Sequence, residues 1–299
     1  MPETSPASHC PTPAVVPAET SPAASGWRTG GQPLVSIITP VLNGKAFLAA
    51  CLESTLGQSY PHIEHIVADG GSTDGTLDLL AEYSSRYPGR VRFFTGQDRN
   101  GEDGWNKGIL VARGDIFGWL GADDMFAPGA IATIVNYYLA HPGAEFVFGG
   151  YETVNESGQT LKRFMLKDFD FDEALNDNCH IATTSAFYTR QVIEAVGLLD
   201  VSLVPGDYDY WLRMAKHFPP HRLPEVLSRF RLHANRITSA PRARTRHVWV
   251  TYRTSLRHGG KRFSRRLRRY LIFRAADFCR PALQPVFPWV RRLLGWPTT

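Results

Sequence analysis

The chain has 299 residues, 43% of them hydrophobic, which is enough for a sizeable core in one large α/β domain. Its four cysteines are scattered without metal-ligand spacing, which argues against a disulfide scaffold and indicates reduced thiols in the cytosol. The opening "MPETSPASHC" lacks an apolar core, and no stretch approaches 18 consecutive apolar residues. We therefore expect a cytoplasmic protein with neither signal peptide nor membrane-spanning helix.

The net charge of +5 is divided unevenly along the chain. Residues 241–299 hold fourteen arginines and one lysine against a single acid, for a net charge of +14, and residues 1–240 carry −9. A basic tail on an acidic body indicates a negatively charged partner, either membrane lipid or nucleic acid.

Residues 1–33 are rich in Pro, Ala, Ser and Thr, which predicts disorder. Beyond them, apolar runs predict strands and periodic segments predict helices in alternation. The expected strands are 35–38, 62–69, 91–96, 116–124 and 145–151, and the expected helices are 44–58, 76–87, 104–112 and 129–141. This order favours an α/β fold with a mainly parallel sheet covered by helices on both faces.

Ligands of such sheets bind at the carboxyl ends of the strands, which places Thr39, Asp69, Asp123 and Asp124 around one crevice. The glycines of "ADGGSTDGT" (68–76) suit a turn whose backbone approaches a ligand. Adjacent carboxylates repel each other, and a bound cation would relieve that repulsion. Oxygen ligands favour Mg²⁺ or Mn²⁺. The alternative for each acid is structural, as a turn former or a helix cap.

Two further stretches contain candidate site residues. "GDYDYWLRMA" (206–215) places Asp207 and Asp209 at the start of a predicted helix, where either is a candidate general base or a helix cap. His233 follows an apolar run in "FRLHANRIT" and by itself is more often structural.

Taken together and in order, seven pieces resemble family 2 glycosyltransferases with the GT-A fold, especially bacterial members that build surface polysaccharides. The resemblance covers residues 34–240, and the pieces are "SIITPVLNG", "ADGGSTDGT", "NKGILVARGD", "WLGADD", "HIATTSAFYTR", "GDYDYWLR" and "RLH". It implies that the chain transfers a sugar from a nucleotide-diphospho-sugar, which by family tendency is a UDP-sugar, to a glycan or lipid-linked acceptor.

The resemblance implies roles for individual donor-side residues. Asp69 would contact the nucleotide base, and a carboxylate suits uracil because it accepts the N3–H hydrogen bond. Thr39 and Pro40 would line the same pocket, and Asn106 and Lys107 match a family region near the donor. Asp124 would bind a divalent ion, Mn²⁺ or Mg²⁺, with Asp123 on the ribose or the metal. His233 would help to hold the metal or the diphosphate.

On the acceptor side, Asp207 falls on the family's catalytic base and would deprotonate the attacking hydroxyl, so that one in-line displacement inverts the anomeric centre. Gly206 replaces the glutamate found there in many members, and Asp209 remains a second candidate. His180 matches an acceptor-side position. The Gln-x-x-Arg-Trp motif of processive synthases is absent, so we expect one sugar per encounter.

The tail 241–299 lies beyond the resemblance. Its arginines oppose an apolar helical face formed by Phe263, Leu267, Tyr270, Leu271 and Phe278, and the aromatic residues of 286–296 follow. This pattern is typical of helices on anionic bilayers. This favours peripheral attachment to the cytoplasmic face of the inner membrane, and packing on the catalytic domain is the alternative. No nucleic-acid module accompanies the arginines, so we expect no nucleic-acid partner. A second hypothesis for the whole chain is a catalytically silent nucleotide-sugar-binding or membrane-scaffold protein of the same fold.

Overall fold

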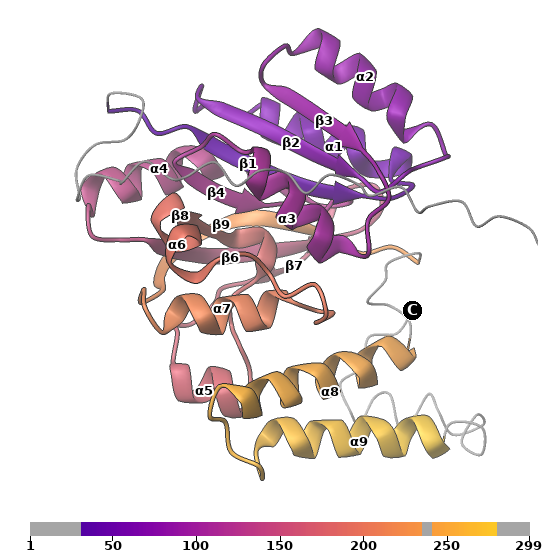
Figure 1. The fold of residues 1–299 in the computed structure, drawn as a ribbon, viewed down its shortest axis with the longest axis vertical. Helices are drawn as coiled ribbons and strands as arrows, with labels where there is room; N and C mark the ends of the chain where they lie inside the picture. The colour runs from indigo at the N-terminus through magenta and orange to yellow at the C-terminus, as the bar shows by residue number, and fades with distance from the viewer. Residues whose placement is uncertain (1–30, 235–240, 280–299) are drawn as a thin grey trace, which may run out of the picture.

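The computed structural model describes residues 31–234 and 241–279 (Figure 1). Most of the segment predicted to be disordered, 1–33, and the aromatic residues of 286–296 lie outside these ranges. Among the helices that are described, none combines the length and the apolar character needed to cross a bilayer.

Within the described residues, nine strands form one mixed sheet in the order β3-β2-β1-β4-β8-β6-β9-β5, with β7 paired to β6. Strands β3, β2, β1 and β4 are parallel to one another, whereas β8 runs antiparallel to both β4 and β6. Strand β9 is parallel to β6, and β5 is antiparallel to β9. The strands are β1 (Val35–Val41), β2 (Ile63–Asp69), β3 (Val91–Thr95), β4 (Ile116–Trp119), β5 (Met125–Phe126), β6 (Phe146–Val154), β7 (Thr160–Phe164), β8 (Ala186–Thr189) and β9 (His221–Arg231).

Helices cover both faces of the sheet, as the alternating sequence predicts (Figure 1). One face packs on α1 (Lys45–Leu56), α2 (Thr76–Arg86) and α4 (Ala130–Ala140). The other packs on α3 (Gly101–Val111), α6 (Arg190–Val196) and α7 (Asp207–Ala215) through a cluster of buried aromatic rings. Trp119 is at its centre, stacked on Trp105 and Tyr210 and tilted against Trp211, which is 1% exposed. All five predicted strands and four predicted helices are confirmed, with ends shifted by a few residues.

Two C-terminal helices, α8 (Pro241–Arg257) and α9 (Arg265–Cys279), form a pair beside α7 and the short helix α5 (Phe171–Asn176) (Figure 1). Arg266 of α9 is 5% exposed and donates hydrogen bonds to the carbonyls of Ala174 and Leu175. Its guanidinium lies 4.2 Å from the ring centroid of Tyr208 on α7. The described part of the tail therefore packs on the body of the protein, and its separation as a unit at residue 241 stays a prediction.

Burial of His65 in β2 links folding stability to pH. Burial lowers the pKa of His65 from its usual 6.5 to about 3, and the ring shares a 2.8 Å hydrogen bond with Thr39. At pH values between these two pKa values, the unfolded chain therefore binds one more proton at His65 than the folded chain does. We expect the unfolding free energy to fall by about 1.4 kcal/mol for each unit that the pH drops below 6.5.

Urea denaturation between pH 7 and pH 5 checks this prediction in the wild type and two variants. His65→Gln removes the titrating ring and should flatten the pH dependence, whereas the same change at the exposed His217 should keep it. An equal slope in His65→Gln and the wild type would mean that other groups cause the dependence.

Candidate functional site

The turn of the "ADGGSTDGT" stretch is joined to the neighbouring β1–α1 loop by hydrogen bonds. Asn43, which has a positive φ of 52°, donates its N–H to Ser72 Oγ at 2.7 Å and accepts the N–H of Thr73 at 2.8 Å. Asp74 accepts the N–H of Lys45 at 3.0 Å and the N–H of Thr76, its neighbour at the start of α2. The two loops therefore form one fixed backbone surface at the carboxyl ends of β1 and β2.

Asp69 ends β2 at this surface and is 1% exposed. One carboxylate oxygen, Oδ2, accepts hydrogen bonds from the N–H groups of Gly71 and Ser72 and from Thr95 Oγ1, at 2.7 to 3.1 Å. Burial alone would raise the pKa of Asp69, but the hydrogen bonds from Ser72, Thr95 and Gly71 lower it. The other oxygen, Oδ1, has no hydrogen-bond partner among the residues that the structure describes. This oxygen is therefore a buried acceptor whose hydrogen-bonding capacity is unused within the described residues.

Asp98, in the loop after β3, lies beside the turn that follows Asp69. An added Cβ at Gly70 or Gly104 would lie 3.4 or 3.0 Å from Asp98 Oδ2, and at Gly104 it would lie 2.8 Å from Pro40 Cβ. Lys107 of α3 donates to Asp98 Oδ1 at 2.5 Å. Pro40 and Lys107 are thus close to one another through Asp98, and Lys107 is already paired with an acid.

Thr39 and Asn106 have their side-chain polar groups bonded to other parts of the protein. Thr39 is fully buried, and its hydroxyl bonds to His65. The amide of Asn106 donates to the Leu199 carbonyl and accepts the Leu199 N–H, both at 2.9 Å, which ties α3 to the loop before α7. A donor contact by either residue stays a prediction.

The acids of "ADD" lie in the turn between β4 and β5, where β9 contacts them. The N–H of Arg231 donates to Asp124 Oδ1 at 2.9 Å, and its guanidinium donates to the Asp123 carbonyl at 3.0 Å. His233 Nε2 lies 2.9 Å from Asp123 Oδ2. The structure therefore brings together all three residues predicted as metal ligands, Asp123, Asp124 and His233.

The donor chemistry of this turn fits a divalent cation. An added Cβ at Gly121 would lie 2.8 Å from Asp124 Oδ2 and 2.9 Å from Asp123 Oδ1, so only glycine lets both carboxylates lie this close to the backbone of the turn. Within residues 31–234 and 241–279, no group of three or more acids, histidines or cysteines is arranged to hold a metal ion. A pair of adjacent carboxylates suits an ion whose remaining ligands come from a diphosphate.

Asp207 is the first residue of α7. Its carboxylate accepts the Thr183 hydroxyl at 2.6 Å. The preceding N–H, of Gly206, donates to Glu102 Oε1 of α3 at 2.9 Å, and an added Cβ at Gly206 would lie 2.8 Å from Glu102 Cγ. Burial raises the pKa of the Glu102 carboxyl, and the charge of Asp207 adds to this. Glycine is therefore required at 206 because Glu102 fills the adjacent space.

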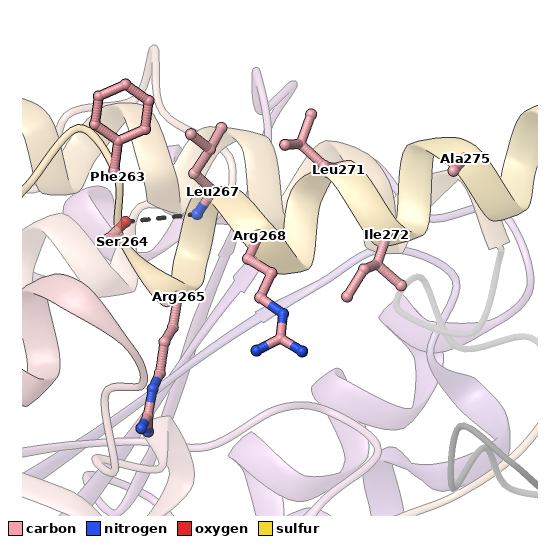
Figure 2. Close-up of a pocket in the computed structure, with 8 residues that line it drawn as sticks. All are labelled: Phe263, Ser264, Arg265, Leu267, Arg268, Leu271, Ile272 and Ala275. Carbon is pink, nitrogen blue, oxygen red and sulfur yellow. Dashed lines mark hydrogen bonds between the residues drawn. The ribbon is translucent and has the colours of Figure 1, made fainter.

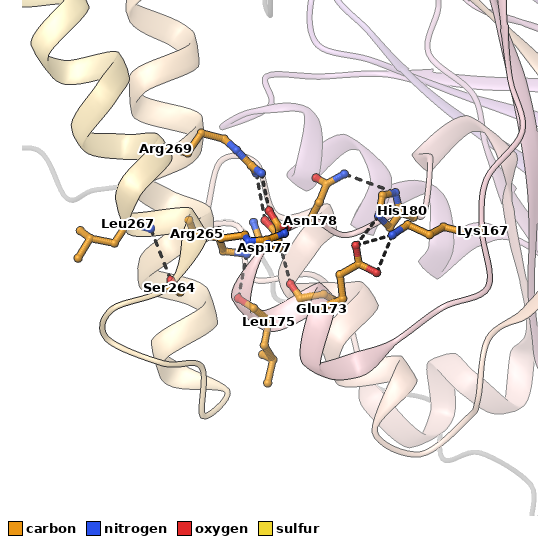
Figure 3. Close-up of polar contacts among 12 residues, drawn as sticks. Lys167, Glu173, Leu175, Asp177, Asn178, His180, Ser264, Arg265, Leu267 and Arg269 are labelled. Atoms are coloured by element: carbon orange, nitrogen blue, oxygen red, sulfur yellow. Dashed lines mark hydrogen bonds and ion pairs between the residues drawn. The ribbon is translucent and has the colours of Figure 1, made fainter.

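Asp209 and His180 are the remaining sequence-predicted candidates. Both oxygens of Asp209 are engaged, at 2.9 Å by Arg213 Nε and at 2.8 Å by His258 Nε2 of the loop after α8. His180 Nε2 lies 3.1 Å from Glu173, which also pairs with Lys167 (Figure 3). Both oxygens of Asp207 also accept hydrogen bonds, from the Thr183 hydroxyl and the Tyr208 N–H, but neither partner is a cation. The pairing of Asp209 with Arg213 and its use in attaching the tail therefore favour Asp207 as a base.

Three residues near the site were not singled out from sequence: Asp98, Glu102 and Arg231. Asp98 follows an apolar strand, as Asp69 does, so the rule used for Asp69 would have found it. Glu102 and Arg231 act on residues more than 100 positions away, and no local pattern indicates such a contact.

Comparison with known proteins identifies the family to which the chain belongs. The model of the family described as Glycosyl transferase family 2 matches residues 36–197, more than half of the chain. The chain therefore belongs to glycosyltransferase family 2.

Curated relatives are similar over most of the chain. A putative teichuronic acid biosynthesis glycosyltransferase of Bacillus subtilis is 28% identical over 229 residues, covering 75% of this chain and 89% of the relative. A PGL/p-HBAD biosynthesis glycosyltransferase of Mycobacterium tuberculosis is 31% identical over 185 residues, covering 60% of this chain and 69% of the relative. An uncharacterized glycosyltransferase of Rickettsia felis is 27% identical over 68% of this chain, which spans only 35% of that relative.

Solved structures confirm the predicted GT-A class of fold. TarS 1–349 of S. aureus in complex with UDP-GlcNAc superposes with a TM-score of 0.58 at 14% identity, over 74% of this chain and 66% of that one. The mannosyltransferase PcManGT of Pyrobaculum calidifontis, in complex with GDP-Man and Mn²⁺, superposes with a TM-score of 0.59 at 18% identity, over 84% and 73%.

Proposed function

We propose that this protein is an inverting, metal-dependent glycosyltransferase that moves a sugar from a nucleotide-diphospho-sugar to a hydroxyl of a glycan or lipid-linked acceptor in cell-surface polysaccharide biosynthesis. The observation that carries the proposal is the placement of three sets of carboxylates. Asp69 ends β2 and the Asp123–Asp124 pair follows β4, the two parallel strands that flank β1, and Asp207 begins a separate helix tied to α3 through Glu102. The relatives named for teichuronic acid and PGL/p-HBAD biosynthesis support the class of product.

The donor is proposed to be a UDP-sugar, held at the Asp69 end of the crevice. The Oδ1 atom of Asp69 is buried without a partner in the described chain, and the lowered pKa of this acid keeps it ionised. A uracil ring offers one N–H group whose hydrogen bond such an oxygen accepts. The backbone of 70–75, which is held by hydrogen bonds, packs against the nucleoside. TarS binds UDP-GlcNAc and PcManGT binds GDP-Man, so solved neighbours of this fold use either nucleotide.

A divalent ion, Mn²⁺ or Mg²⁺, is proposed to bind at Asp124 and Asp123, with His233 adjoining. When bound, such an ion supplies positive charge that offsets the charge developing on the departing nucleoside diphosphate. The chain itself contributes the orientation of both acids: Arg231 fixes Asp124 through its N–H and Asp123 through its guanidinium. PcManGT, which is solved with Mn²⁺, supports this assignment.

The proton of the acceptor hydroxyl is proposed to move to the Asp207 carboxylate as that hydroxyl oxygen forms the new bond to the anomeric carbon. The bond from that carbon to the diphosphate oxygen breaks on the opposite side, so the configuration inverts. Thr183 and the backbone fixed by Glu102 hold the carboxylate in place for this transfer.

Calorimetric titration of UDP, GDP and dTDP into the full chain tests the donor site. We expect one of the three, UDP, to bind in the presence of Mn²⁺ and to lose affinity in EDTA. Asp69→Asn should weaken UDP binding, because an amide nitrogen in place of Oδ1 repels the base N–H. Metal-dependent binding without any sugar transfer to candidate acceptors would instead favour a silent nucleotide-sugar-binding protein. No binding of any nucleotide would contradict the donor site.

A further inference from the structure

Helix α9 has two faces of different character. Its inward face is fixed to the body by Arg266. It is fixed to α8 by Tyr270, whose ring centroid lies 4.6 Å from that of Trp249, and by Asp277, which accepts the Thr245 hydroxyl. Arg265 and Arg269 both pair with Asp177 beyond the end of α5 (Figure 3). The orientation of α9 about its own axis is therefore set by contacts along its length.

The outward face of α9 and the residues just before it form a shallow apolar groove (Figure 2). Phe263 is 93% exposed and Leu271 is 54% exposed, and Ile272 and Leu267 continue the surface. Single exposed apolar residues are ordinary in proteins, but a contiguous row along one helix marks an interaction surface. We call the surface lined by Phe263, Leu267, Arg268, Leu271, Ile272 and Ala275 the α9 face.

The charge around the α9 face is of one sign. Residues 241–279 contain eleven arginines and one lysine but a single acid, Asp277, and that acid is directed inward to Thr245. Arg268 projects on the same side of α9 as Ile272, and it forms no ion pair within the described residues (Figure 2). A partner must therefore offer apolar surface together with negative charge.

We propose that the α9 face docks on the surface of a bilayer that contains anionic lipid. An interfacial helix of this kind buries its apolar side chains at the level of the acyl boundary while its arginines meet lipid phosphates. The sequence pattern predicted a membrane-associated tail, but it included Tyr270, which is 9% exposed and turned inward; the docking residues are instead those of the α9 face. Because α9 packs on Tyr208, next to Asp207, docking also places the proposed base on the membrane side of the protein. This consequence rests on the proposed function.

Vesicle sedimentation of the full chain tests the docking independently of sugar transfer. We expect binding to vesicles of phosphatidylcholine with phosphatidylglycerol, and much weaker binding to phosphatidylcholine alone. Leu271→Glu should reduce binding at least tenfold, and Arg268→Gln about fivefold, because each basic residue near an anionic surface contributes about that factor. Leu139→Glu is the matched control: Leu139 is 45% exposed on α4, on the opposite side of the sheet, and the change should leave binding intact.

Three outcomes would overturn the proposal. Unchanged binding in Leu271→Glu would assign vesicle attachment to another part of the chain, such as 280–299. Equal loss in Leu271→Glu and Leu139→Glu would mean that added negative charge, and not the α9 face, explains the effect. A dimer in analytical ultracentrifugation that Leu271→Glu dissociates, with no vesicle binding, would identify a second copy as the occupant. Nucleotide titration of the same variants reports separately on the proposed function.

Discussion

Asp207→Asn should lower the turnover of sugar transfer by about a hundredfold to ten-thousandfold while leaving nucleotide binding close to normal. The amide keeps the size of the carboxylate and can still accept the Thr183 hydroxyl, so the start of α7 should keep its structure. It cannot accept the proton of an attacking hydroxyl, and this is the function that is removed. Turnover with a donor and acceptor pair, and UDP affinity by calorimetry, separate the two effects.

Asp209→Asn is the control for this experiment. Asp209 begins the same helix two residues later, but its oxygens face Arg213 and His258. We expect this variant to lose thermal stability, because an ion pair that attaches the tail is broken, and to keep most of its turnover once folded. If Asp209→Asn lost turnover and Asp207→Asn did not, the base would have to be reassigned to Asp209.

Asp124→Asn should lower metal-dependent turnover by about a thousandfold, the equivalent of about 4 kcal/mol of lost transition-state stabilisation. The amide oxygen can still accept the N–H of Arg231, so the turn should remain in place. The variant loses the negative charge that Asp124 holds beside Asp123 and Gly121, and with it the attraction for a divalent ion. Initial rates measured over a range of Mn²⁺ concentrations should show both a lower maximum and a weaker half-saturation.

Asp115→Asn is the matched control for Asp124→Asn. Asp115 is also buried, but it precedes β4 and accepts the Leu34 N–H at 2.9 Å, at the end of the strand away from the crevice. This variant should lower stability and leave the Mn²⁺ dependence unchanged. Full activity of Asp124→Asn at ordinary Mn²⁺ concentrations would refute the metal assignment.

The part of the fold in which neighbouring segments of the chain pair with one another could be predicted from sequence. The run from Val35 to Trp119 alternates strand and helix, and its strands pair in parallel, so apolar periodicity and turn residues placed Asp69 correctly at a strand end. The two glycines after Asp69 indicated a turn that the structure confirms. Short-range patterns suffice where neighbours in the chain are neighbours in space.

The rest of the fold depends on contacts between distant segments. Strands β8, β6, β9 and β5 are joined out of chain order and in both directions, which no local periodicity specifies. Glu102 illustrates the same limit within the site: as one acid in a helix it looks solvated, yet it is 5% exposed and explains why glycine occupies position 206. The inward turn of Tyr270 on α9 was likewise decided by its contact with Trp249 and not by helical spacing.

Strand β9 has a consequence for how the protein is made. Among the described residues it is the last strand in chain order, yet it lies between β6 and β5, and Arg231 at its end fixes Asp124 across 107 residues. Contacts of such long sequence separation form late, since a large loop must close before they can stabilise anything. A nascent chain that has emerged only as far as β8 can pair its first parallel strands, but its two adjacent acids still lack Arg231. We therefore expect nucleotide-binding competence to arise abruptly once β9 has left the ribosome.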